Sequence, residues 1–283
     1  MTRLELEAWL AAPSRRPLVM GIVNITPDSF SDGGEFLTPE AAVAHAMQLV
    51  EAGADVLDIG GESTRPGSQR IEPAEQIARI SPVLRKLAAR TDTAMSVDTT
   101  RNEVAAAALD LGVAAVNDIS AGRDDPVMFP LVAEWKAALI LMHMQGEPAT
   151  MQLNPVYSDV IGEIIAFLRE RIEAARQAGV YGHRIVVDPG LGFGKTLGHN
   201  LEILRQLHEF TTLGQPLLVG TSRKGFIGRV TGEAEPSRRL MGTAASIAWS
   251  VAAGADIVRV HDVSEMAKVV RMIDAIRGAA SPS

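Results

Sequence analysis

The chain of 283 residues contains no cysteine, which excludes disulfide bonds, thiolate metal ligands and cysteine nucleophiles. It also lacks a basic excess, since 27 Lys and Arg stand against 34 Asp and Glu, for a formal net charge of −7. Proteins that bind nucleic acid normally show the opposite balance. Nucleic acid is therefore not an expected partner.

Long apolar runs are missing as well, because no segment approaches the roughly 18 residues that a membrane-spanning helix needs. The first ten residues, Met1–Leu10, carry acidic side chains through a short apolar pattern, which differs from the basic-then-apolar order of a secretory signal. We therefore expect a cytoplasmic protein with no membrane partner.

Metal-binding patterns are also absent from the sequence. There is no His-Glu-x-x-His motif, no tight histidine cluster and no acidic triplet, so a closed cage of protein ligands is not expected. Magnesium needs fewer protein ligands, because it keeps several waters and binds substrate phosphates. Asn24 could contribute one carbonyl oxygen. Met142 and Met144, around His143, are interpreted as core or pocket filling and not as metal ligands.

What the sequence does contain is an alternation of short β-rich runs and amphipathic helical stretches after Pro17. Most of the runs are continuously apolar, which is typical of parallel strands buried on both faces. With 47% hydrophobic residues, the chain can bury a large core. Eight strands are predicted, at Leu18–Asn24, Val56–Gly60, Ala94–Asp98, Ala115–Asp118, Ala138–His143, Ile185–Asp188, Leu217–Gly220 and Ile257–His261.

Eight such units predict one (β/α)8 barrel (a TIM barrel) of class α/β that spans residues 1–283. Residues 1–16 are expected to form an N-terminal extension and residues 279–283 a frayed tail. The helix predicted before the second strand has clear start and stop signals, with Thr38 as N-cap, Pro39 in the first turn and Gly53 at the end. An open doubly wound sheet is the alternative. Both folds place ligands at the carboxyl ends of the strands.

Polar residues gather at these strand ends. Asp98, Asn117 and Asp188 each end a strand, where their oxygens and amide could bind the edge of a planar heterocycle. Helix capping is the alternative for Asp98 and Asn117. Arg259 and His261 lie two residues apart on the last strand, so they share one side. A structural ion pair is the alternative role for these two cations.

Three loops at the strand ends are candidates for ligand binding. Gly60 and Gly61 precede a loop in which Arg65 could bind a phosphate or a carboxylate, although a solvated surface loop is equally compatible. Lys224 follows the seventh strand, where barrels often bind phosphate, but it could also form a solvated charge pair. The tract Asp188–Thr196 matches neither the P-loop nor the dinucleotide fingerprint. We interpret it as a flexible loop that offers Phe193 for stacking, with a plain glycine-rich turn as the alternative.

Eight segments of the chain, which include the strand ends and loops described above, together resemble dihydropteroate synthase. The resemblance runs from about Leu18 to Val270, and several of its motifs are long. The matching segments are Met20–Phe30, Asp58–Gly67, Ser96–Thr99, Asn117–Ser120, Met142–Gly146, Asp188–Lys195, Thr221–Lys224 and Arg259–Asp262.

The resemblance implies a (β/α)8 barrel, usually a homodimer, that acts in folate biosynthesis and is a target of sulfonamides. Such a transferase condenses 6-hydroxymethyl-7,8-dihydropterin diphosphate with 4-aminobenzoate and releases pyrophosphate, with Mg²⁺ as cofactor. Mobile loops around 28–34 and 63–67 would close over the site to exclude water.

The roles that the resemblance implies for individual residues fall into four overlapping groups. Catalysis would rest on Arg65, Asp98, Lys224, Arg259 and His261. The pterin would be bound by Asp98, Asn117, Met142, Asp188 and Lys224. The diphosphate would be bound by Asn24, Thr64, Arg65, Arg259 and His261, with Asn24 also touching the metal. The 4-aminobenzoate would be bound by Phe30, Thr64, Pro66, Phe193 and Lys224.

One departure from the family pattern concerns the residue after Lys224. Many members have serine there, whereas this chain has Gly225, which puts a hydroxyl contact to the benzoate carboxylate in doubt. A backbone amide at a helix start could serve instead.

Two other function classes use a similar barrel. A pterin-dependent methyltransferase has no diphosphate to bind, so Asn24, Arg65, Arg259 and His261 argue against it. A catalytically inactive pterin-binding module is the second alternative, and the filled motif positions count against it.

Overall fold

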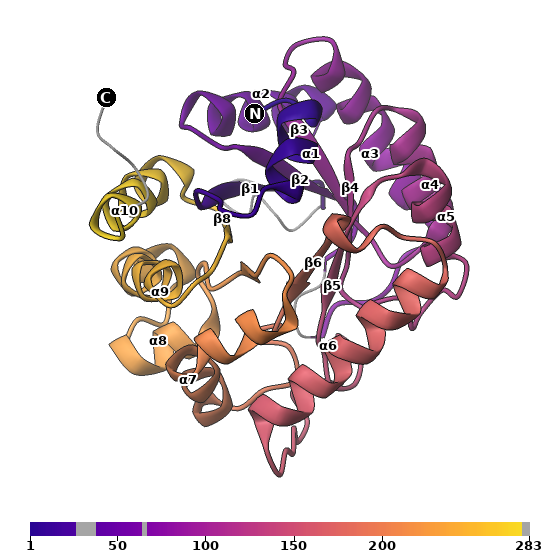
Figure 1. Ribbon diagram of the computed structural model, residues 1–283. Coiled ribbons are helices and arrows are strands. Elements are labelled where there is room, and N and C mark those ends of the chain that lie inside the picture. Colours follow the sequence, from indigo (N-terminus) through magenta and orange to yellow (C-terminus); the bar gives the residue numbers. More distant parts are fainter. Residues whose placement is uncertain (27–37, 64–66, 279–283) are drawn as a thin grey trace.

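The computed structural model describes residues 1–26, 38–63 and 67–278. Eight parallel strands form a barrel, and helices surround it (Figure 1). The strand order is β6-β5-β4-β3-β2-β1-β8-β7. The strands are β1 Leu18–Asn24, β2 Val56–Gly60, β3 Ala94–Asp98, β4 Ala115–Asp118, β5 Ala138–Met142, β6 Ile185–Asp188, β7 Leu218–Val219 and β8 Ile257–Val260.

The (β/α)8 prediction is therefore confirmed, and the open doubly wound sheet is excluded by the way the ends of the sheet meet. An isolated parallel bridge joins Val187 to Leu217, and the Val187 amide donates to the Pro216 carbonyl at 2.9 Å. β7 is shorter than predicted, while β5 and β8 each end one residue early. The seam between β6 and β7 is consequently the thinnest part of the ladder.

The helices follow the strands as the alternation predicts. At α2, the Thr38 hydroxyl accepts from the Ala41 amide at 3.2 Å, and Gly53 takes a φ of 102° after the last turn. Such a left-handed conformation suits glycine. The outer helices are α2 Pro39–Glu51, α3 Pro73–Ala88, α4 Asn102–Asp110, α5 Met128–Trp135, α6 Val160–Gln177, α7 Leu197–Arg205, α8 Gly225–Thr231, α9 Leu240–Ala252 and α10 Val263–Ile276.

The N-terminal extension contains a helix, α1 Arg3–Ala11, that closes one end of the barrel. Its buried residues Leu6, Trp9 and Leu10 pack against the apolar side chains at the start of the strands. The Ala94 amide also donates to the Met1 carbonyl at 2.7 Å. The extension is thus part of the core.

Inside the barrel, the side chains change from apolar to polar along the strands. The lower residues of the lumen include Met20, Val56 and Ile257. Every second residue faces the lumen, and the strand ends place Asn24 beside Gly60, and Asp98 between Gly60 and Asn117. The barrel therefore has an apolar floor and a polar mouth.

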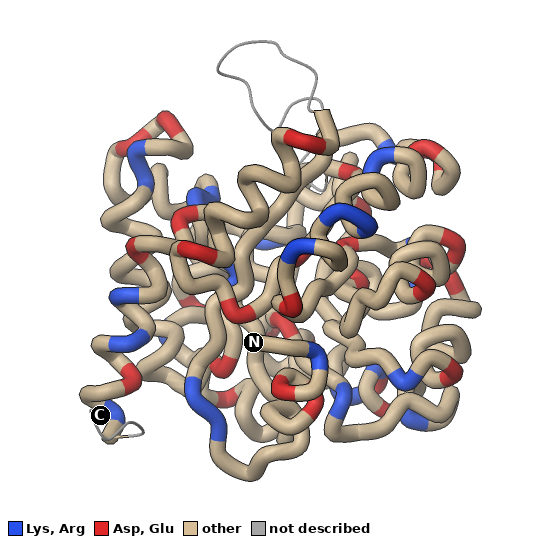
Figure 2. The backbone as a smooth tube through the Cα atoms, turned by 90° about the horizontal axis from the view of Figure 1, so that it is seen from above, with Lys and Arg blue, Asp and Glu red and all other residues tan. Residues whose placement is uncertain are grey.

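Charged residues of both signs are interspersed along the chain outside the barrel (Figure 2). None of the helices in the described ranges has the length and apolar character that would let it cross a membrane.

Candidate active site

Arg259 lies at the centre of the polar mouth and binds two carboxylates. Its Nε donates to Asp58 Oδ2 at 2.6 Å, and its Nη2 donates to Asp98 Oδ2 at 2.8 Å. The three residues come from β8, β2 and β3. A buried cation needs such anionic partners, so the ion pair that the sequence offered as an alternative role is present.

Asp58 was missed by the sequence analysis as a site residue. Its side chain is completely buried and accepts from Ser96 Oγ at 2.5 Å and from Asn117 Nδ2 at 3.0 Å, in addition to Arg259. The available signal was a carboxylate inside an apolar strand, two residues before Gly60. Asp58 thus connects Arg259 to β3 and β4.

Helix capping does not explain Asp98 and Asn117. Helix α4 has its N-cap at Arg101, and α5 has its N-cap at Val127. Burial raises the pKa of Asp98, although the Arg259 guanidinium opposes this shift. Two carboxylates share one guanidinium here, so the lumen favours a ligand edge that donates hydrogen bonds.

The opposite wall of the mouth contains Asp188, Lys224 and Phe193. Asp188 Oδ1 accepts from the Gly190 amide at 2.7 Å, and burial raises the pKa of its carboxyl group, while the nearby Lys224 lowers it. Lys224 Nζ donates to the Leu191 carbonyl and lies 4.5 Å from the centroid of the Phe193 ring. Burial lowers the pKa of Lys224 to about 8.

Apolar side chains line the mouth between these polar walls. Met142 is buried in a small cluster with Ile119, Met144 and Met151, and Phe193 packs against it. The cluster is separate from the barrel floor and from the layer between strands and helices. Together with the polar groups above, it suits a flat ring with a hydrogen-bonding edge.

Asn24, at the end of β1, is the predicted metal ligand. A Cβ placed on Gly60 would lie 3.4 Å from Asn24 Oδ1 and 3.6 Å from the Asp98 Cβ, so glycine leaves room between the two side chains. An amide oxygen is a suitable Mg²⁺ ligand when substrate phosphates and water complete the shell. In the described ranges, no three His, Cys, Asp or Glu side chains form a metal-binding group. The amide oxygen of Asn24 therefore fits a Mg²⁺ site that takes most of its ligands from water and substrate phosphates.

His261 follows β8 and binds Ser222, a second residue that the sequence analysis missed. The Ser222 hydroxyl accepts from the His261 amide at 3.1 Å, and it lies 3.0 Å from Nδ1 of the same ring. Ser222 itself is 6% exposed. The serine of the motif Thr221–Lys224 was visible in the sequence, but only Lys224 was predicted as a site residue.

The loop after β6, which the sequence analysis interpreted as flexible, makes several contacts with the residues that follow β5. Buried Lys195 donates to the carbonyls of His143 and Phe193, at 3.3 and 3.0 Å, and lies 3.1 Å from His143 Nδ1. A Cβ on Gly190 would lie 1.9 Å from the His143 carbonyl oxygen. The glycines therefore permit close approach of the backbone to β5.

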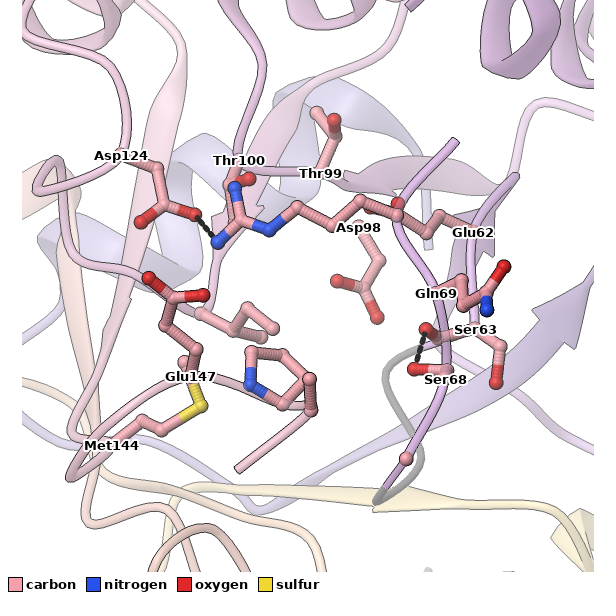
Figure 3. Close-up of a pocket in the computed structure, with 15 residues that line it drawn as sticks. Glu62, Ser63, Ser68, Gln69, Asp98, Thr99, Thr100, Asp124, Met144 and Glu147 are labelled. Atoms are coloured by element: carbon pink, nitrogen blue, oxygen red, sulfur yellow. Dashed lines mark hydrogen bonds and ion pairs between the residues drawn. The ribbon is translucent and has the colours of Figure 1, made fainter. Parts of the chain in front are cut away.

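A cavity of about 400 Å³ opens beside Asp98, whose carboxylate points into it (Figure 3). Residues from the loops after β2, β3, β4 and β5 line it, including Glu62, Thr100, Asp124 and Glu147. Of the predicted site residues that the structure describes, only Asp98 lines this cavity. Among the other described site residues, Arg259 contacts Asp98 directly and is linked to Asn117 through Asp58, and Lys224 lies beside Phe193.

Four predicted site residues, Phe30, Thr64, Arg65 and Pro66, lie outside the described residues. Most of the two segments expected to act as closing loops lies there too. Their roles stay predictions.

Comparison with known proteins identifies the family of this chain. A family model described as pterin binding enzyme matches residues 20–261. Dihydropteroate synthase from Synechocystis is 47% identical over 262 residues, which cover 93% of this chain and 91% of the relative. Two solved structures from Xanthomonas albilineans are similar as well. Dihydropteroate synthase with 4-aminobenzoic acid has a TM-score of 0.88 and 44% identity, with 94% of each chain covered. The complex with 7,8-dihydropteroate has a TM-score of 0.84 and 42% identity, with 94% and 95% covered.

The variant Asp58→Asn tests the contacts of Arg259. Removing one partner of a buried ion pair is costly, so we expect the free energy of unfolding to fall by about 3 kcal/mol in urea denaturation. The matched control is Glu75→Gln, which breaks the pair with Arg79 at a glutamate whose side chain is 53% exposed; the expected change is below about 1 kcal/mol. Equal effects of the two variants would contradict the central place given to Asp58.

Proposed function

The chain belongs to the pterin binding enzymes and, among them, to the dihydropteroate synthases, and from this premise we propose how its barrel mouth divides the work of the reaction. The enzyme condenses 6-hydroxymethyl-7,8-dihydropterin diphosphate with 4-aminobenzoate, giving 7,8-dihydropteroate and pyrophosphate in folate biosynthesis. The observation that carries the proposal is the convergence of Arg259, Asp98 and Asn117 with Asp188 and Lys224 around one lumen. We take residues 1–283 to act as one barrel unit.

The pterin ring is proposed to lie deepest, between the two walls. Asp98 and Asp188 would accept hydrogen bonds from the amino group and ring N–H, while Asn117 and Lys224 would donate to ring acceptors. In support, Oδ1 of Asp98 accepts no hydrogen bond from the described residues. The apolar Met142 would contact the face of the ring.

The diphosphate is proposed to lie above the ring, against Arg259, His261 and Asn24. Cleavage of the bond between the pterin methylene and oxygen leaves a cation delocalised into the ring and a highly charged leaving group. The reaction therefore needs electrostatic stabilisation, which Arg259 and His261 would provide together with the predicted Thr64 and Arg65. Asn24 would hold Mg²⁺, which when bound supplies positive charge against the phosphate oxygens.

The 4-aminobenzoate is proposed to enter last, over Phe193 and Lys224. Its amine is neutral at pH 7 and keeps a lone pair, so a strong general base is not required. The Lys224 ammonium would attract its carboxylate, and the predicted Phe30, Thr64 and Pro66 would complete the pocket. A Cβ added to Gly225 would meet nothing within 4 Å, so this position leaves open space where many relatives have serine.

We also propose that the enzyme is a homodimer that pairs through α9 and α10. Helix α9 contains no charged residue, and its exposed positions include Met241 at 79% and Trp249 at 54%. The neighbouring α10 exposes Met272 and Ile276. Exposed apolar residues on two neighbouring helices favour a protein–protein interface. The cytoplasmic location stays a prediction.

The function is tested by mixing purified protein with the pterin diphosphate, 4-aminobenzoate and Mg²⁺, and measuring both products. We expect pyrophosphate and dihydropteroate in equal amounts, and slower turnover when Mg²⁺ is chelated. The variant Arg259→Ala should lower kcat by about 10²-fold or more, as for other groups that stabilise developing charge. Full activity of that variant would remove Arg259 from the site.

A pH dependence follows from Lys224. Because its pKa is lowered to about 8, the ammonium is lost as the pH rises through that value, and the KM for 4-aminobenzoate should then rise about tenfold per pH unit. In Lys224→Arg the guanidinium stays protonated, so this alkaline rise should vanish whatever the absolute rate. A rise that persists in the arginine variant would assign it to another group.

The dimer is tested by Met241→Glu, which places a charge in the proposed interface. Sedimentation equilibrium should show a dimer for the unsubstituted protein and a shift toward monomer for the variant. Leu4→Glu on α1, where the leucine is 77% exposed, is the control and should leave the dimer intact. A monomeric unsubstituted protein would contradict the proposal.

A further inference from the structure

We propose that Arg223 and Asp262 are positioning residues, whose ion pair holds Lys224 and His261 in one geometry across the barrel mouth. The inference rests on the proposed function, because it takes Lys224 and His261 to be groups that meet the substrates. Neither Arg223 nor Asp262 was a candidate site residue, although each is the chain neighbour of one.

The pair joins two different strands at the same end of the barrel. Arg223 Nε donates to Asp262 Oδ2 at 3.0 Å, and Nη2 donates to Oδ1 at 2.5 Å. Arg223 lies in the turn after β7, and Asp262 follows His261 at the end of β8. This two-point contact fixes orientation as well as distance. It therefore ties the turn carrying Lys224 to the strand end carrying His261.

The backbone of Arg223 is held in a conformation that arginine rarely adopts. Its φ is 59°, in the left-handed region that is unfavourable for residues with a Cβ. Three contacts maintain it, because its amide donates to Thr243 Oγ1 at 3.1 Å, its carbonyl accepts from Arg239 Nη1 at 2.8 Å, and its side chain binds Asp262. Strain maintained from three elements beside a site points to positioning rather than to stability.

The side chain of Asp262 does not cap helix α10. It occupies the N-cap of α10, where aspartate normally accepts from the first turn. Its carboxylate makes no such capping bond to α10, all of whose residues the structure describes. The side chain is used for Arg223 instead.

The second link between the same two segments orients the His261 ring. Ser222 Oγ accepts from the His261 amide at 3.1 Å and lies 3.0 Å from Nδ1 of the ring. The ring is therefore held against the turn that also carries Arg223 and Lys224. Loss of the neighbouring ion pair would loosen both this hydrogen bond and the placement of Lys224.

The test is a double-mutant cycle with Arg223→Gln, Asp262→Asn and the double variant. Small misplacements of catalytic groups cost up to about 10²-fold in rate, so each single variant should lower kcat/KM by about 10- to 100-fold. If the two residues act as a pair, the double variant should lose no more than the worse single variant. Losses that multiply would overturn the proposal.

Binding measurements separate positioning from a general structural role. Pyrophosphate affinity, which reports on His261, and the KM for 4-aminobenzoate, which reports on Lys224, should both worsen. Affinity for a pterin fragment should worsen less than either, because Asp98, Asn117 and Asp188 would bind it in addition to Lys224. Equal weakening of all three ligands would indicate a structural role and overturn the proposal.

Two further variants keep the result independent of folding. Arg223→Gly relieves the backbone strain while removing the guanidinium, so it should fold at least as well and still show the kinetic loss. Arg16→Gln is the matched control, because Arg16 binds Asp55 with two contacts of 3.2 and 2.6 Å at the other end of the barrel. It should leave both constants unchanged. A fully active Arg223→Gly would overturn the proposal.

Failure of this inference and failure of the proposed function give different results. If Arg259→Ala is inactive while Asp262→Asn keeps unaltered constants, only the positioning role is wrong. If Arg259→Ala is fully active, the diphosphate assignment itself is wrong, whatever the Asp262 variant shows.

Discussion

The site depends on one largely buried arginine, whose side chain is 20% exposed, and on the two carboxylates that pair with it. Arg259 could not lie in the lumen unpaired, and its partners Asp58 and Asp98 are separated from it by 201 and 161 residues of chain. Asp58 in turn accepts from Ser96 and Asn117. The charge of Arg259 on β8 therefore requires polar groups in the upper lumen, and these come from β2, β3 and β4.

The architecture could be predicted from the sequence because strand-like and helix-like patterns alternate regularly along the chain. Continuous apolar runs predicted the strands to within a few residues, and the caps and glycine stops marked the helices between them. The two-residue period also placed Arg259 and His261 on one side of the last strand, and the contact of Arg259 with Asp58 shows that its side chain lies in the lumen. The resemblance then supplied the chemistry, which the relatives' identity supports.

The sequence could not predict which polar side chains contact each other across the barrel. Asp58 looked like part of a motif, and only the closed barrel shows that it is the principal partner of Arg259. Ser222, Arg223 and Asp262 owe their contacts to the adjacency of β7 and β8 in space. The role of α1 was hidden for the same reason, because a short amphipathic segment does not reveal the surface that it covers. Pairing across the fold is a tertiary property, and local patterns do not encode it.

The apolar floor has a consequence for the order of events. Because α1 packs against the lower lumen residues, the described residues close that end of the barrel, and substrates and products would pass through the opposite end. The ligand that lies deepest must enter before the one above it, and a product that spans both levels has to withdraw outward as a unit. In the proposed arrangement, the pterin would therefore bind first, and the pterin part of the product would leave last.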